Sequence, residues 1–423
     1  MNIIKKYMEN DYLVSLFSKC IIALLGIFNS VLIYRYLGVD LKGEYAYYLN
    51  IINILAVILN LGIYQGFPYF MKTGTKKVKL KEEFLSIILI QFIIYLFLVT
   101  LFCKFFMVEF LMLSFVLCAQ ILNNQMDFIL LIDNFKKRVF VNIISSISNT
   151  LLLLSFFIFV KESSIQNIYI CILAKDIIGI ILRIKMYNVH IIEIVSHFKI
   201  SMFWRAIKFG FIPMITTLLI TLNYKVDVLI LKRFTDYANI GLYSTGVALA
   251  GQLWIVPDAF KDVLFNRTAK NNAKNEICLS IKINVCICII ITILFIFFGK
   301  IVIIFLYGLE FADSYFVALI TIIGIIPMVY YKMIYPLFIS DGRRMQSILS
   351  LSIAFLFNIV LNFLLIPQYG INGSAFSSVI SYSICGLFFC VKFMGLYKVK
   401  FSQLFIINMM DLKKIRNIRK SMK

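Results

Sequence analysis

The stretch Ile87–Phe102, IILIQFIIYLFLVTLF, decides the class of fold to which this 423-residue chain belongs. It carries no charged side chain, and the block Asn284–Gly299, NVCICIIITILFIFFG, has the same character. A bilayer core about 30 Å thick is crossed by about 20 apolar helical residues. Because the backbone must satisfy its own hydrogen bonds in lipid, such blocks favour α-helices. They recur along the chain, so the sequence predicts an all-α integral membrane protein.

The composition supports a membrane protein over a soluble one. Hydrophobic residues make up 61% of the chain and charged residues 15%, whereas soluble domains are about half apolar and about a quarter charged. Alternating strand patterns typical of an outer-membrane barrel are absent. The first apolar run continues beyond Val31 without a small-residue cleavage site, so we expect it to be retained as a helix. The nine cysteines are scattered through apolar runs and indicate neither disulfides nor a zinc site.

The apolar runs predict twelve transmembrane helices joined by short connections. Their expected ranges are 12–34, 44–70, 84–103, 106–131, 139–160, 167–185, 207–231, 241–261, 280–299, 314–338, 346–366 and 373–395.

The basic residues predict the orientation of these helices. With a cytoplasmic amino terminus, the cytoplasmic segments together with the inner ends of some spans hold 31 of the 42 Lys and Arg residues. These segments are 1–11, 71–83, 132–138, 183–208, 261–282, 339–345 and 392–423. The outer connections hold seven, and four lie inside spans. This bias is the one that the positive-inside rule describes, so both termini are expected to be cytoplasmic. The net charge of +21 also raises the question of nucleic-acid binding. Because the charge lies in cytoplasmic loops and in the tail 396–423, anionic lipid headgroups explain it, and we expect no nucleic-acid partner.

An internal repeat predicts two related halves. Asn29–Tyr45, NSVLIYRYLGVDLKGEY, aligns with Asp227–Tyr243, DVLILKRFTDYANIGLY, at an offset of 198 residues. Both stretches have the same predicted orientation, and parallel halves with a substrate path between them are a transporter design. We therefore expect an N-terminal six-helix lobe at 1–195, a C-terminal six-helix lobe at 196–395, and the basic tail.

Three segments resemble a known family. They are RYLGVDLKGEYAYY, AIKFGFIPMITTLLITLNYKVDVLILKRFTDYANIGLYSTGVALAG and NIVLNFLLIPQYGINGSAFSSVISY. They are similar to polysaccharide biosynthesis flippases, the Wzx-type O-antigen and capsule repeat-unit translocases of the multidrug/oligosaccharidyl-lipid/polysaccharide (MOP) exporter superfamily. The three segments are specific for the superfamily and not for a particular substrate.

The resemblance implies a fold and a function. The fold would be a MATE-like, V-shaped pair of six-helix lobes in the bacterial inner membrane. The protein would move undecaprenyl-pyrophosphate-linked oligosaccharide units from the cytoplasmic to the outer leaflet by alternating access, for O-antigen (lipopolysaccharide) or capsule synthesis. It would be a transporter and not an enzyme, without a cofactor, coupled as an antiporter to a proton or sodium gradient, and in contact with a polysaccharide polymerase and glycosyltransferases.

Two alternatives remain open at this point. One is a multidrug or cation exporter of the same superfamily, for which we expect a less cationic cavity. The other is a membrane-embedded polysaccharide polymerase or ligase, an enzyme class that usually carries catalytic groups on a long outer loop. The longest outer connection here, residues 300–313, is short for that role. No GxxxxGK[ST] loop is present, so the chain is not by itself an ATP-driven pump.

Cations within the spans are the candidates for binding pyrophosphate. An ionisable side chain in a span costs several kcal/mol unless it faces a partner or a wet cavity, which makes it a functional candidate. Charge-assisted hydrogen bonds to phosphate oxygens would replace lost water. The candidates are Lys19, Arg35, Lys175, Lys225 and Lys332. Alternatively, Lys175 pairs with its neighbour only to hold the bundle together, and Lys19, Lys332 and Arg35 reach the headgroups at the membrane surface.

Carboxylates and amides complete the candidate residues. Asp127, Asp176 and Asp227 are candidates for ion coupling, because a buried carboxylate can take up a proton near neutral pH. Asp227 also falls on the acidic position that the resemblance implies for the seventh span. Asn53 and Asn358 are candidates for hydrogen bonds to sugars, although amides between membrane helices often serve only to hold helices together. The only two histidines predict no metal site.

Overall fold

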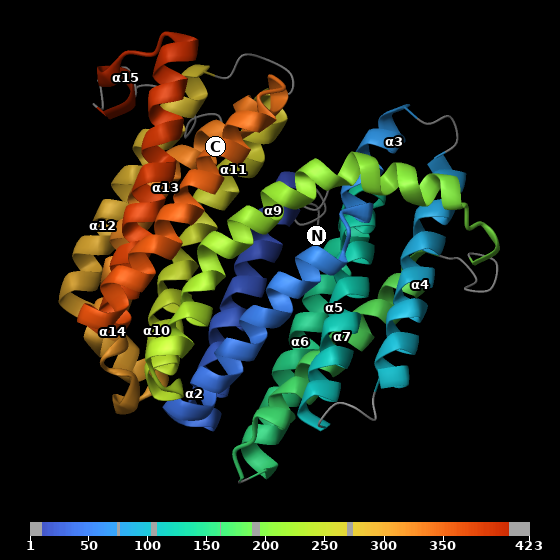
Figure 1. Ribbon diagram of the computed structural model, residues 1–423, viewed down its shortest axis with the longest axis horizontal. Helices are drawn as coiled ribbons and strands as arrows, with labels where there is room; N and C mark the ends of the chain where they lie inside the picture. Colours follow the sequence, from blue (N-terminus) through green and yellow to red (C-terminus); the bar gives the residue numbers. More distant parts are fainter. Residues whose placement is uncertain are drawn as a thin grey trace, which may run out of the picture. The chain divides into compact units, whose positions relative to one another are not determined.

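The structure is a computed structural model that describes residues 11–73, 77–102, 108–160, 162–187, 195–268 and 274–405. Within these ranges the chain is almost entirely helical, with short connections, and contains no β-strand (Figure 1). It divides into two compact units, unit 1 (Met1–Lys225) and unit 2 (Val226–Lys423). Each unit is described by itself below.

Unit 1 begins with a long bent helix and continues with four shorter apolar helices. Its elements are α2 (Asp11–Leu59), the 3-10 turn η1 (Ile63–Gly66), α3 (Phe67–Thr73), α4 (Lys77–Phe102), α5 (Val108–Asp133), α6 (Phe135–Phe159), α7 (Ile165–Tyr187) and the first part of α9 (Ile200–Phe234).

Unit 2 contains the rest of α9 and a second set of long helices. Its further elements are α10 (Tyr237–Gly251), η3 (Gln252–Trp254), α11 (Ile255–Thr268), α12 (Lys274–Tyr307), η4 (Leu309–Phe311), α13 (Ser314–Ser340), α14 (Arg344–Tyr397) and α15 (Phe401–Phe405).

The helices confirm the predicted all-α membrane fold. Ten helical stretches among the described residues are long and apolar enough to cross a bilayer. Two of them, α2 and α14, each bend at a glycine with positive φ, Gly38 (φ 68°) and Gly370 (φ 56°), a conformation that glycine adopts without steric cost. Dividing α2 and α14 at these bends gives the twelve expected passes.

The two bends differ from the loops that the sequence suggested. The apolar runs predicted a connection over residues 35–43, but helical backbone continues on both sides of Gly38. Leu37 and Lys42 are buried there. A single glycine therefore reverses the chain where a hydropathy pattern indicates a loop.

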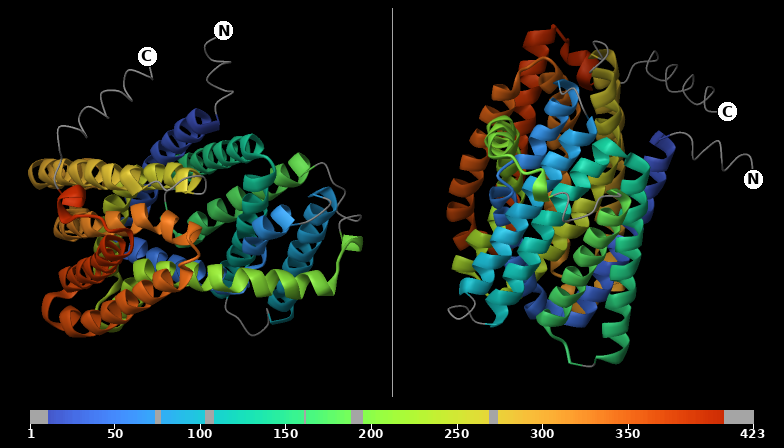
Figure 2. Two further views of the ribbon diagram at one scale, coloured as in Figure 1. Left: turned by 90° about the horizontal axis from the view of Figure 1, so that it is seen from above. Right: turned by 90° about the vertical axis from the view of Figure 1, so that its right-hand side faces the viewer.

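Unit 1 is held together by contacts of α2 with α5 and α6, of α4 with α5, and of α7 with α5 and α6 (Figure 2). Its largest apolar cluster includes Phe67, Phe84 and Leu122, where η1 and α3 meet α4 and α5. Since lipid tails are as apolar as these side chains, close packing and not hydrophobic burial favours the association of the helices.

Unit 2 is built around α13, which packs against α10, α11, α12 and α14. Glycines allow this close approach. A Cβ atom on Gly386 would lie 2.0 Å from the carbonyl oxygen of Pro327, and one on Gly246 would lie 2.8 Å from that of Ser314. Small residues at helix contacts are typical of membrane proteins.

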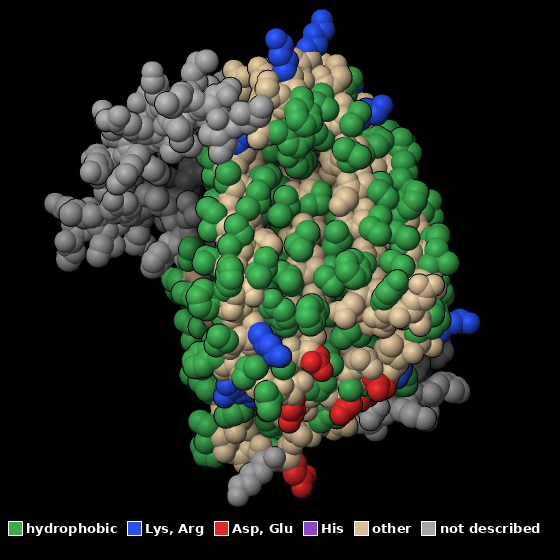
Figure 3. Space-filling model, turned by 90° about the vertical axis from the view of Figure 1, so that its left-hand side faces the viewer, with side chains coloured by type: hydrophobic (Ala, Val, Ile, Leu, Met, Phe, Trp, Pro, Cys, Tyr) green, Lys and Arg blue, Asp and Glu red, His purple; other side chains and the backbone are tan. Residues whose placement is uncertain are grey.

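The surface in Figure 3 is largely hydrophobic, with Lys, Arg, Asp and Glu side chains towards its two ends. Large apolar side chains of α12, such as Phe297 and Phe305, are exposed (71% and 77%). A soluble protein would bury such residues. Together with the length of the helices, this surface identifies a multi-pass membrane protein.

The helix α9 begins in unit 1 and ends in unit 2. Its first part lies against η1 and α3: a Cβ on Gly210 would be 1.9 Å from the carbonyl oxygen of Gly62. The rings of Tyr69 and Phe209 stack with centroids 4.2 Å apart. The first part of α9 is therefore fixed to unit 1 through direct backbone contact.

Candidate functional sites

Lys225 is a cation in an apolar helix with a neutral partner. It lies in α9 at the end of unit 1, is half-buried, and donates a hydrogen bond of 3.1 Å from Nζ to Oδ1 of Asn50 in α2. Among the described residues, no carboxylate forms an ion pair with it. The ammonium group thus has a neutral amide and not a carboxylate as its partner in the described part of the structure.

Lys42 is a second cation in the same unit, and the sequence analysis assigned it to an outer loop. It is only 3% exposed. Its Nζ lies 4.5 Å from the ring centroid of Tyr34 and 5.8 Å from that of Tyr45, positions in which the aromatic faces stabilise a cation. The charge of Lys225 acts on Lys42 electrostatically. The internal repeat contained a signal for this burial. At the offset of 198 residues Lys42 aligns with the apolar residue Ile240, which is fully buried in the structure.

A hydrogen-bonded ionic cluster joins α5, α6 and α7, and we call it the Arg183 cluster. Arg183 is 3% exposed. Its Nη2 donates to Oδ1 of Asp127 at 2.8 Å and to Oδ1 of Asn142 at 2.5 Å. Its Nη1 donates to Oδ1 of Asn123, whose Nδ2 donates to Oδ1 of Asp176 at 2.7 Å.

Two further cations complete the Arg183 cluster. Nε of Arg138 donates to Oδ2 of Asp127 at 2.8 Å, and Nζ of Lys175 lies 3.3 Å from Oδ1 of Asp176. The cluster thus contains three cations and two carboxylates. The predicted pair of Lys175 and Asp176 exists, and the sequence analysis missed Arg183, which it placed at the start of a cytoplasmic segment.

Asp227 is the centre of a neutral hydrogen-bonding site in unit 2. The side chain is 2% exposed. It accepts hydrogen bonds from the hydroxyl of Tyr243 (2.8 Å), Oγ of Ser378 (2.5 Å) and Nδ2 of Asn362 (2.9 Å). Within the described residues, none of these partners is a cation and no ion pair includes this carboxylate.

A second layer of polar side chains supports this arrangement. Nδ2 of Asn362 also donates to Oδ1 of Asn358 at 3.1 Å, and Oγ of Ser374 donates to Oδ1 of Asn362 at 2.8 Å. One side chain of α10 and four side chains from the two halves of α14 therefore surround the carboxylate that α9 contributes. A site with several oxygen atoms and one negative charge suits a small hard cation or a proton.

The predicted candidate Lys332 is buried in an ion pair in unit 2. Its Nζ lies 2.7 Å from Oδ1 of Asp258 and 4.0 Å from the ring centroid of Trp254. Lys261 also contacts this carboxylate oxygen, at 3.1 Å. Lys332 as a whole residue is 7% exposed. It therefore does not extend to the surface, which one interpretation of the sequence had allowed.

The remaining predicted residues lie in α2. Oδ1 of Asn53 accepts a hydrogen bond of 3.0 Å from Nε2 of Gln120 in α5, which links two helices. Arg35 is exposed near the bend at Gly38. The side chain of Lys19 is outside the part of the chain that the structure describes.

The predicted residues therefore form separate groups. In unit 1, Lys225 contacts α2, whereas Lys175, Asp176 and Asp127 belong to the Arg183 cluster. In unit 2, Asp227 and Asn358 share one site, and Lys332 belongs to another with Asp258.

No family model matches the chain. A search of curated proteins found no match either. Solved structures do match. The chain is similar to the lipid II flippase MurJ in an inward closed conformation, with a TM-score of 0.70, 17% identity, and coverage of 97% of this chain and 92% of that one.

Two MATE transporters show the same likeness. An inward-facing MATE family transporter of the MOP superfamily has a TM-score of 0.66 at 12% identity, covering 90% of this chain and 96% of that one. The MATE transporter VcmN from Vibrio cholerae has a TM-score of 0.63 at 14% identity, covering 94% and 98%. The chain thus has the fold of MOP superfamily transporters. This fold is shared by a lipid II flippase and by a multidrug resistance transporter, so the fold alone does not identify the cargo.

Proposed function

We propose that this protein is a flippase for undecaprenyl-pyrophosphate-linked oligosaccharide units, working by alternating access in the bacterial inner membrane. Both termini would be cytoplasmic, and the lobes at 1–195 and 196–395 would enclose a V-shaped cavity. The flippase–exporter fold and the charge pattern of the loops support this proposal. Its cargo would pass to a polymerase that joins units made by glycosyltransferases.

The cations of unit 1 carry the proposal. Lys225 has only a neutral amide as its hydrogen-bond partner, and Lys42 is buried against two tyrosine rings in the same unit. A cation such as Lys225, which has no carboxylate partner among the described residues, is costly in a membrane unless an anion uses it. A pyrophosphate provides several anionic oxygens for such charge-assisted contacts. Arg35, Lys19 and Lys175 would extend this phosphate path, and Asn53 would bind sugar hydroxyls.

Asp227 is our proposed site for the coupling ion. A proton or Na⁺ would neutralise a buried carboxylate that the described residues surround only with neutral donors. Asp127 and Asp176 are less suited, because arginine and lysine already neutralise them. Asn358 would take part through the amide of Asn362, whereas Lys332 would act in a separate anion contact.

A second candidate function is the export of a drug or organic cation. The carboxylate of Asp227 favours it, because a buried anion can bind a cationic cargo directly. The two candidates differ in the role of Lys225, which would assist a pyrophosphate and would repel a cationic drug.

The decisive experiment deletes the native gene and restores it with variants. Lys225→Ala should abolish surface polysaccharide while undecaprenyl-linked units accumulate facing the cytoplasm. Lys225→Arg should retain function, because it keeps the charge. The matched control is Lys300→Ala, a change at an exposed lysine of α12.

The outcomes separate the classes of protein. Normal polysaccharide in Lys225→Ala cells with wild-type protein levels would falsify the role of this cation. Single units at the surface of deleted cells would indicate a polymerase. Unchanged polysaccharide with increased drug sensitivity would indicate an exporter.

A further inference from the structure

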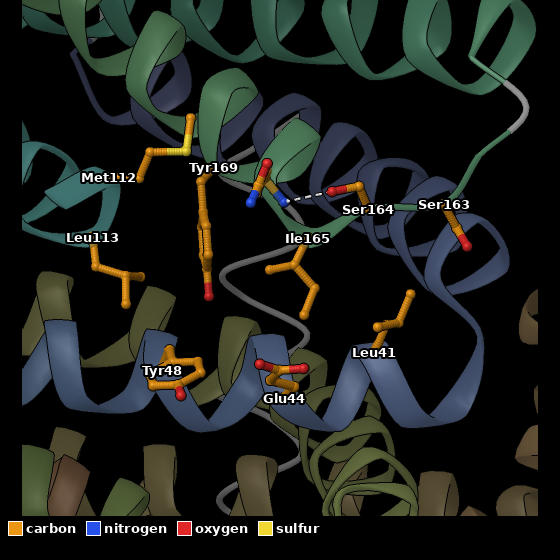
Figure 4. A pocket seen from close by; sticks show the side chains of 10 residues that line it. Leu41, Glu44, Tyr48, Met112, Leu113, Ser163, Ser164, Ile165 and Tyr169 are labelled. Atoms are coloured by element: carbon orange, nitrogen blue, oxygen red, sulfur yellow. Dashed lines mark hydrogen bonds between the residues drawn. The ribbon is translucent and has the colours of Figure 1, made fainter. Parts of the chain in front are cut away.

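A pocket lies at one end of unit 1, between the second half of α2, the start of α5 and the segment that leads into α7 (Figure 4). Its cavity has a volume of about 220 Å³. Four apolar residues and six polar ones line it, the polar ones being Glu44, Tyr48, Ser163, Ser164, Gln166 and Tyr169. The loop charges predict that this end of the unit faces outward.

The lining of the pocket offers no cation to a pyrophosphate. Among the residues that line the pocket, Glu44 is the one with a charge, and that charge is negative. The lining thus lacks the lysine and arginine side chains that form charge-assisted contacts with phosphate oxygens, in contrast to the region of Lys42 and Lys225. We therefore expect a neutral or positively charged ligand.

The mixture of rings and hydrogen-bonding groups fits a sugar. A sugar ring has apolar C–H faces, which pack on aromatic rings, and hydroxyl groups around its edge. Serine hydroxyls, the amide of Gln166 and the carboxylate of Glu44 together offer donors and acceptors for those hydroxyls. In Figure 4, Tyr169 extends from α7 towards Tyr48 and Glu44 of α2, so both elements contribute groups to one space.

The size and rigidity of the pocket indicate how large its ligand is. The cavity is far larger than the roughly 10–15 Å³ that one water needs, and smaller than the roughly 300–1,000 Å³ of pockets for drug-sized ligands. Phe110 packs edge-on against Tyr48 with ring centroids 6.4 Å apart, and Tyr45 packs against Tyr169 at 6.0 Å. Side chains that are fixed before binding lose little entropy when a ligand arrives.

We propose that this pocket binds one neutral or amino sugar of the glycan at the outer end of unit 1. The inference rests on the proposed function, since it gives the sugar part of the cargo a site separate from the site of its pyrophosphate. The sugar ring packs on Tyr48, and the carboxylate of Glu44 accepts hydrogen bonds from two neighbouring hydroxyls or from an amino group.

The test measures binding of methyl glycosides to the purified full-length protein by saturation-transfer NMR, in a detergent without a sugar headgroup. The probes are the methyl glycosides of glucose, galactose, glucosamine and N-acetylglucosamine, with inorganic pyrophosphate as competitor. At least one glycoside should bind saturably, and pyrophosphate should not displace it. Glu44→Gln should weaken binding by about tenfold, the effect of losing a hydrogen bond to a charged group.

Conservative variants guard against misfolding. Tyr48→Phe should retain binding because it keeps the ring, whereas Tyr48→Leu should lose it. Glu310→Gln, at an exposed carboxylate of unit 2, is the matched control and should bind normally. The proposal is wrong if no glycoside binds saturably, if pyrophosphate competes, or if both Glu44→Gln and Tyr48→Leu bind as the wild type does.

The polysaccharide assay keeps the two proposals apart. If glycosides bind as expected but deletion of the gene leaves polysaccharide unchanged, the pocket is a sugar site and the flippase proposal fails. If deletion traps the lipid-linked units inside but no glycoside binds, the flippase proposal holds and the sugar site fails.

Discussion

At the scale of single residues, the environment of a charge separates structural groups from candidate functional ones. Asp127 and Asp176 form ion pairs with arginine and lysine, and a buried carboxylate without such a partner would destabilise the helix bundle. Asp227 contacts only neutral donors among the described residues. The partners, rather than the depth of burial, therefore distinguish the ion-paired aspartates from Asp227, for which we propose a functional role.

Replacing Asp227 by Asn should remove ion binding while preserving the shape of the site. We expect the melting temperature of the wild type to rise when Na⁺ replaces choline, or when the pH falls if the ligand is a proton, because a ligand of the folded state stabilises it. The variant should lose this response. The control is Asp236→Asn, at the exposed carboxylate that caps α10, since asparagine caps helices equally well. An unchanged response in the Asp227 variant would contradict the assignment.

Sequence patterns predicted part of these sites. Asp227 and Asn358 were recognisable because a charge and amides within apolar runs are costly, and Tyr243 is an aligned residue of the repeat. Ser374 and Ser378 carried no such signal, since serine is common in membrane helices. Lys42 and Arg183 were assigned to segments outside the spans because hydropathy is an average over many residues. The burial of Lys42 against two tyrosine rings, and of Arg183 against two amides, depends on how the helices pack, which the hydropathy pattern does not contain.

At the scale of elements, Gly179 of α7 makes the Arg183 cluster possible. A Cβ at this position would lie 2.7 Å from Nη1 of Arg183, 2.9 Å from Oδ1 of Asn123 and 3.2 Å from Oγ of Ser145. The helix can therefore approach α5 and α6 only if the side chain is absent.

Gly179→Leu should displace the guanidinium and leave buried charges unpaired. Breaking a buried ion pair costs roughly 3–5 kcal/mol, so we expect a clearly lower melting temperature and less protein in the membrane. The matched control is Gly26→Ala in α2, where a Cβ would meet nothing within 4 Å. That change should be neutral or stabilise the helix by about 0.5–1 kcal/mol. Equal melting temperatures for the two variants would contradict the importance of this contact.

At the scale of the whole molecule, the direction of transport depends on which ends of the helices face the cytoplasm. The helical structure agrees with twelve passes, and an even number puts both termini on one side of the membrane. The 31-to-7 distribution of basic residues predicts that this is the cytoplasmic side. In that orientation the pocket beside Ser163 is on the side where a flippase releases its cargo.

Labelling with a membrane-impermeant maleimide tests this orientation in spheroplasts. Single-cysteine changes are placed in a background in which the exposed Cys20 is replaced by serine. Ser163→Cys, in the exposed segment before α7, should react in intact spheroplasts, whereas Arg343→Cys, at the exposed start of α14, should react only after permeabilisation. The opposite pattern would place the termini outside, and would put the cations of unit 1 and the pocket on the wrong side for export. Equal reactivity at both positions before permeabilisation would indicate leaky membranes, which the unmodified background and a cytosolic marker protein monitor in the same sample.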